Sequence, residues 1–72
     1  MIKVKFLLDT NMKYKKSEKS RYEWYSTDIM KHETFEFSDL LRVSNGIALF
    51  VCLDDELGEV PLNSFAVVEY KN

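Results

Sequence analysis

A tight-turn signal between two β-forming segments constrains this chain more than any other feature. Asn45 and Gly46 both tolerate the positive φ of a type I′ turn, and they follow residues 41–44. After them comes a run, Ile47 to Leu53, that is apolar at every position. Strands joined by two residues pair antiparallel, so a hairpin is predicted here. Because a strand that is apolar on both faces needs cover on both, residues 47–53 are predicted to form the central strand.

Other short segments also favour strands. Residues 2–8 alternate apolar and basic side chains up to Leu8, which predicts a half-buried strand. Further strands are predicted at residues 21–27, 35–37 and 65–70. Turns are expected at residues 9–11, 28–33 and 54–58, the second of which could instead be one helical turn. Residues 13–21 have no hydrophobic period and are expected to form an exposed loop or a hairpin tip.

These segments predict an all-β domain. We expect a small antiparallel barrel or rolled sheet of five to six strands with at most one short helical turn. Residues 1–72 form a single domain, because a core in a chain this short rarely supplies more than ~3–5 kcal/mol. The longest apolar run has seven residues, whereas a membrane-spanning helix needs about 20. With one cysteine and no secretory signal at its start, the chain is predicted to be cytoplasmic, without a membrane partner.

Residues 58–68, Gly-Glu-Val-Pro-Leu-Asn-Ser-Phe-Ala-Val-Val, carry one family resemblance. They are similar to the end of SH3-like barrels, where a Gly-x-apolar-Pro stretch leads through a short 3₁₀ turn into the last strand. The resemblance implies an SH3-like barrel. It implies no function, because one fold hosts many functions, and no proline-peptide groove is carried over from it.

A basic and aromatic segment is the first candidate binding surface. Nucleic-acid surfaces combine lysines that neutralise phosphates with aromatic faces that stack on bases. The candidate residues are Lys13, Tyr14, Lys15, Lys16, Lys19, Arg21, Trp24 and Tyr25. In the alternative reading, the lysines keep a hairpin tip soluble and exposed to water, while Tyr22 and Trp24 pack in the core. The net charge of −2 argues against a dedicated DNA-binding protein, which is usually basic as a whole.

An acidic cluster is the second candidate surface, and it would suit a basic partner. Its members are Asp54, Asp55, Glu56 and Glu59. They lack the ligand spacing of an EF-hand loop, so the sequence does not predict a calcium site. The alternative is that these are simply turn residues whose side chains are exposed to water. The charge is uneven, since residues 1–24 are net basic and residues 25–72 net acidic.

No arrangement of residues predicts an enzyme. His32 lies near Glu33 and Glu36, but a catalytic zinc usually needs three protein ligands, and an exposed loop histidine is the simpler reading. Cys52 lies inside the apolar run, where burial raises the pKa of a thiol and makes it inert. There is no P-loop, dinucleotide-binding glycine pattern or serine elbow. We therefore predict no catalytic residues, no metal site and no cofactor.

The remaining reading is a non-enzymatic binding module. Four aromatic residues are candidates for an exposed interface patch: Tyr14, Tyr25, Phe50 and Tyr70. Lysine outnumbers arginine eight to two, as is common in AT-rich phage and prophage genes, which suggests an inhibitor that binds a host protein or sequesters a small-molecule ligand. The alternatives are nucleic-acid or nucleotide binding through residues 13–25, and a structural or assembly subunit. A homo-oligomer and a monomer both stay open.

Overall fold

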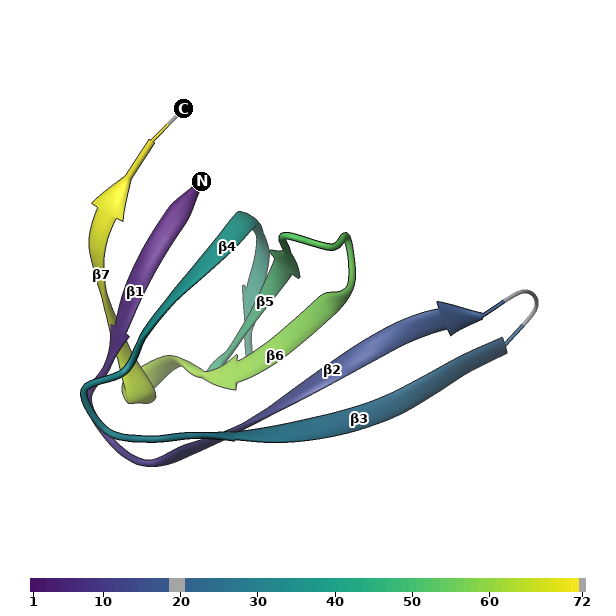
Figure 1. The fold of residues 1–72 in the computed structure, drawn as a ribbon, viewed down its shortest axis with the longest axis horizontal. Coiled ribbons are helices and arrows are strands. Elements are labelled where there is room, and N and C mark those ends of the chain that lie inside the picture. The colour runs from purple at the N-terminus through teal and green to yellow at the C-terminus, as the bar shows by residue number, and fades with distance from the viewer. Residues whose placement is uncertain (19–20, 72) are drawn as a thin grey trace.

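A computed structural model describes residues 1–18 and 21–71, with the backbone alone for residues 16–18, 21 and 22. Figure 1 shows its strands as one curled sheet with no long helix. The elements are β1 (Ile2–Phe6), β2 (Thr10–Glu18), β3 (Arg21–Ile29), β4 (Thr34–Ser44), β5 (Ile47–Cys52), β6 (Leu57–Pro61), the 3₁₀ turn η1 (Leu62–Ser64) and β7 (Phe65–Tyr70). Among the described residues, no helix is long and apolar enough to cross a membrane.

The sheet is antiparallel throughout, with the strand order β3-β2-β6-β5-β4-β1-β7. The predicted all-β class is confirmed. Of the two expected forms, the structure has the open, rolled sheet, and it contains seven strands. β5 is the middle strand of the seven, as its apolar sequence predicted.

The predicted hairpin is confirmed. Asn45 and Gly46 have φ values of 53° and 74°, and Ser44 pairs with Ile47 across the turn. The 3₁₀ turn expected after Pro61 is also present, and the Ser64 hydroxyl closes it by donating to the Pro61 carbonyl at 2.6 Å. These two local predictions succeed because each turn is stabilised by residues within a few positions of one another.

The core is small and centred on phenylalanines. The Phe37 and Phe50 rings stack 4.1 Å apart, and Phe65 meets Phe50 edge-on at 5.4 Å. Around them lie the other buried apolar side chains: Ile2, Val4, Phe6, Met12, Ile29, Ala48, Cys52 and Val60. Phe50, considered above for an exposed patch, is therefore a core residue, because it lies on the inner face of the central strand.

The structure of residues 10–18 differs from the one predicted for the N-terminal third of the chain. These residues form β2 rather than a turn followed by an exposed loop, and they pair with β3 along their whole length in a hairpin, which was the other predicted form for residues 13–21. β6 pairs with residues 13–15 on the other side, so tertiary neighbours stabilise a strand that has no apolar period of its own. The β2–β3 hairpin extends past the other strands as an arm (Figure 1).

Two further expectations about burial are wrong. Trp24 is 54% exposed, because it lies on the face of the arm that is turned away from the core. The first strand ends at Phe6, so Leu8 follows it as an exposed residue instead of completing the buried face. Tyr22, the other aromatic residue expected in the core, has its side chain outside the described part of the structure.

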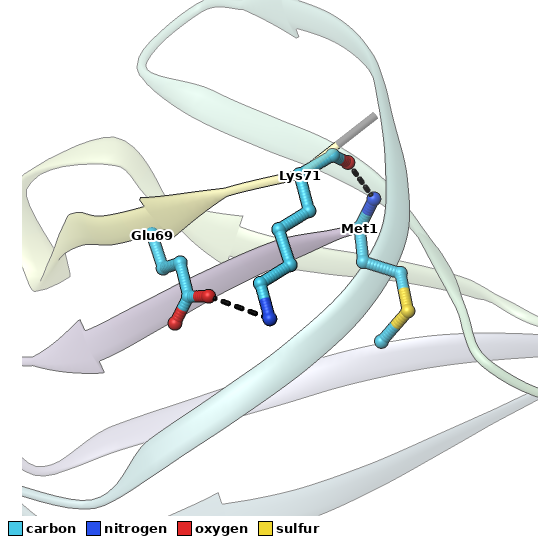
Figure 2. A network of polar contacts seen from close by, with 3 residues as sticks. All are labelled: Met1, Glu69 and Lys71. Carbon is cyan, nitrogen blue, oxygen red and sulfur yellow. Dashed lines mark hydrogen bonds and ion pairs between the residues drawn. The ribbon is translucent and has the colours of Figure 1, made fainter.

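The two ends of the chain lie side by side on β1 and β7. The Met1 ammonium donates to the Lys71 carbonyl (Figure 2). The Lys71 N–H donates to the Met1 carbonyl at 2.8 Å. The Lys71 ammonium also lies 3.0 Å from the Glu69 carboxylate (Figure 2). Both ion-pair side chains are solvated, so this pair adds little to stability.

Candidate functional site

The pleat of β2 and β3 separates the basic residues from the tyrosines. Tyr14 lies opposite Tyr25 on the inner face of the arm, and their rings stack at 5.5 Å. Lys13 and Lys15 lie on the outer face, because side chains one position apart point to opposite sides of a strand. Trp24 lies opposite Lys15 on that outer face, and the Lys15 ammonium is 5.5 Å from the indole centroid.

The inner face of the arm borders a groove of about 860 Å³ that is open to solvent. The beginning of β4 and the turn between β5 and β6 also line it. Three aromatic rings line it, from Tyr14, Tyr25 and Phe35. The other uncharged lining residues are Met12, Thr27, Thr34, Cys52 and Leu53.

Three carboxylates give the groove its charge. They belong to Glu36 on β4 and to Asp54 and Glu56 in the β5–β6 turn. No lysine, arginine or histidine is among the described residues that line the groove. The Tyr25 hydroxyl donates to the nearby Glu23 carboxylate, which adds a fourth acidic group at the arm. The groove therefore presents aromatic faces and negative charge together.

In the structure, each of the two predicted surfaces is divided between the groove and other parts of the molecule. From the basic set, Tyr14 and Tyr25 line the groove, whereas Lys13, Lys15 and Trp24 lie outside it. For Lys16 and Arg21 only the backbone is described, and Lys19 lies outside the described residues. From the acidic set, Asp54 and Glu56 line the groove. Asp55 occupies the turn with a φ of 68°, and Glu59 lies opposite Lys13 on the outer face.

Phe35 and Glu36 are site residues that the sequence reading missed. Their alternation with Phe37 predicted a short strand, and that strand is confirmed as the beginning of β4. Their proximity to Tyr14 and Tyr25 depends on the roll of the whole sheet. No pattern near residue 35 could have indicated it.

Cys52 lies in the wall of the groove with its thiol protonated. Burial, together with the nearby carboxylates of Asp54 and Glu56, raises the pKa of Cys52 to about 11. The predicted burial of this thiol and the predicted rise of its pKa are therefore confirmed. His32 is an exposed turn residue with a φ of 76°. The described residues include no group of three side chains suited to a metal ion.

Comparison of the chain with protein-family models, with curated proteins and with solved structures finds no match in any of the three. The interpretation of the groove accordingly rests on its geometry and chemistry.

Proposed function

We propose that this protein is a non-enzymatic binding module that holds a basic segment of a partner protein in the groove. The observation that carries the proposal is the composition of the groove wall, in which the described residues supply three aromatic rings and three carboxylates but no cation. Lysine and arginine side chains suit such a wall. Their aliphatic stems pack on aromatic faces, while their charged ends meet carboxylates.

Charge also favours a basic partner during encounter. Residues 25–72 carry three Lys or Arg against nine Asp or Glu, and all three groove carboxylates come from this part of the chain. A negative cleft concentrates positively charged segments near its mouth and raises their association rate. A protein acting in this way inhibits its partner by occupying that partner's basic surface. This is how we propose that it would work as a phage- or prophage-type inhibitor of a host protein.

A pair of charge-inverted peptides tests the binding proposal. We expect acetyl-Gly-Arg-Gly-Arg-Gly-amide to shift the NMR signals of the Tyr14 and Tyr25 rings in a saturable way. The same peptide with glutamate in place of arginine should leave those signals unchanged, because the groove repels it. Equal shifts from both peptides, or shifts from neither, would contradict the proposal. Saturation by free arginine amide at the same concentration would indicate a small-ligand site instead of a protein-binding site.

Nucleic-acid binding is the second candidate, and one observation favours it. Trp24 exposes its indole on the outer face beside Lys15, an arrangement on which a base could stack next to a phosphate contact. Glu59 lies opposite Lys13 on the same face, and its carboxylate reduces the net positive charge of that face. If this candidate holds, a single-stranded oligonucleotide will quench Trp24 fluorescence at 20 mM salt, and the quenching will disappear by about 300 mM. Constant fluorescence at low salt rules this face out as a nucleic-acid surface.

A further inference from the structure

The outer face of the central strand β5 is apolar, and no second layer packs on it. The residues of β5 alternate between buried and partly exposed, and Ile47, Leu49 and Val51 are the partly exposed set. The described residues form one sheet and one 3₁₀ turn, so neither another sheet nor a long helix lies over this face (Figure 1). A strand that is apolar on both faces ordinarily has cover on both.

β6 enlarges this apolar face. Pro61 lies opposite Ile47 and Leu57 lies opposite Val51, and both are partly exposed. Opposite residues of paired strands point to the same side of a sheet, so these two belong to the same face. The outer patch is defined here as Ile47, Leu49, Val51, Leu57 and Pro61. Contiguous apolar surface of this kind marks an interaction site.

One row of side chains across the outer patch carries opposite charges at its two ends. Arg42 on β4 lies opposite Leu49, and Leu49 lies opposite Glu59 on β6. Leu49 is therefore midway between a guanidinium and a carboxylate, each one strand away. Within the described part of the structure, neither Arg42 nor Glu59 forms a salt bridge or a side-chain hydrogen bond.

We propose that the outer patch joins two copies of this chain about a two-fold axis that runs along β5 through Leu49. Rotation about this axis exchanges the two ends of the charged row, so the Arg42 guanidinium of each copy meets the Glu59 carboxylate of the other. Leu49 then packs on the Leu49 of the second copy. A two-fold axis across the strands would place like charges together, so the charges specify the orientation.

The geometry of packed sheets suits these contacts. Two sheets that pack face to face lie about 10 Å apart with their strands at about −30°. The long side chains of Arg42 and Glu59 together span that separation, and both lie one strand from the axis, where the rotation displaces them little.

The pair is expected to be weak and to leave the groove free. The outer face of a rolled sheet is convex, so the contact covers three strands and falls below the standard interface of about 800 Å² per partner. We expect a dissociation constant on the order of 0.1 mM. Neither the outer patch nor its two charged residues line the groove, so this inference does not depend on the proposed function.

Two single charge reversals test the pairing. Arg42→Glu gives the row a carboxylate at both ends, and Glu59→Arg gives it a guanidinium at both ends. Either variant alone therefore brings like charges together at both contacts, whereas an equimolar mixture of the two restores opposite charges at both. The matched control is Lys31→Glu, which changes the net charge as Arg42→Glu does, at an exposed turn residue.

Sedimentation equilibrium at low salt, from about 20 µM to about 1 mM protein, measures the association. We expect the natural protein and the Lys31→Glu control to approach the dimer mass. Each reversal alone should raise the dissociation constant by at least about tenfold, and the mixture should return it to near the natural value.

Three results would overturn the pairing. A natural protein that stays monomeric at about 1 mM leaves the outer patch to a different partner. Reversal variants that associate as strongly as the natural protein place any dimer contact elsewhere, and so does a mixture that stays monomeric while the control dimerises. Arg42→Glu should bind acetyl-Gly-Arg-Gly-Arg-Gly-amide as the natural protein does, so failure of the dimer leaves the proposed groove function standing.

Discussion

Replacing Phe50 with alanine is expected to leave the protein largely unfolded at 25 °C. Phe50 is 1% exposed, lies on the central strand, stacks on Phe37 and meets Phe65 edge-on. Removing a buried phenylalanine ring costs about 3–5 kcal/mol, through lost burial and the cavity left behind. The total stability of a domain this small rarely exceeds ~3–5 kcal/mol, so one substitution removes most of it.

Urea unfolding followed by far-UV circular dichroism and by Trp24 fluorescence measures this effect. The control is Tyr70→Ala, which removes an aromatic ring that is 65% exposed on the edge strand β7. The control should change the free energy of unfolding by no more than about 0.5 kcal/mol. A cooperative Phe50→Ala transition within 1 kcal/mol of the natural protein would show that the stacked phenylalanines do not dominate the core.

Neutralising the groove carboxylates is expected to weaken binding of acetyl-Gly-Arg-Gly-Arg-Gly-amide by roughly tenfold to a hundredfold. The variant is the triple substitution Glu36→Gln, Asp54→Asn and Glu56→Gln. Each exchange keeps the size of the side chain and an acceptor oxygen, including the Asp54 oxygen that accepts from the Glu56 N–H. Each partly solvated charge contributes about 0.5–1 kcal/mol to holding a cation, and the three together give the expected range.

A second triple variant separates this effect from net charge. Asp28→Asn, Asp39→Asn and Glu59→Gln remove the same number of charges from residues that do not line the groove. Calorimetric titration at low salt should show nearly unaltered affinity for this control. If the two triple variants lose affinity equally, the peptide responds to the overall charge of the protein, and the groove is not its site.

The groove arises from how β4 is shared between two neighbours. β4 is eleven residues long, and its register with β5 shifts near residues 38 and 41. Such irregularities increase local twist and bend, so the first part of the strand follows β1 while the rest follows β5. The resulting separation leaves residues 34–36 facing the arm across an open space.

The amino-acid sequence by itself determined the local structure of this protein. The period-two alternation at residues 2–6, the Asn45–Gly46 turn and the apolar run of β5 each carry their own signal, because side-chain burial and backbone φ act within a few residues. Tyr14, Tyr25, Asp54 and Glu56 were also candidates from sequence alone, since exposed aromatic and acidic residues are typical of interfaces and charged turns.

Only the tertiary structure decided which of these candidates meet. Residues 13–18 became a strand because β3 and β6 supply their hydrogen bonds, although their own sequence lacks a strand pattern. The same pairing sorted Tyr14 inward and Lys15 outward, and the roll of the sheet brought Phe35 and Glu36 to the tyrosines. The physical reason is that strand pairing joins residues far apart in the chain, so its energy depends on neighbours that no local pattern specifies.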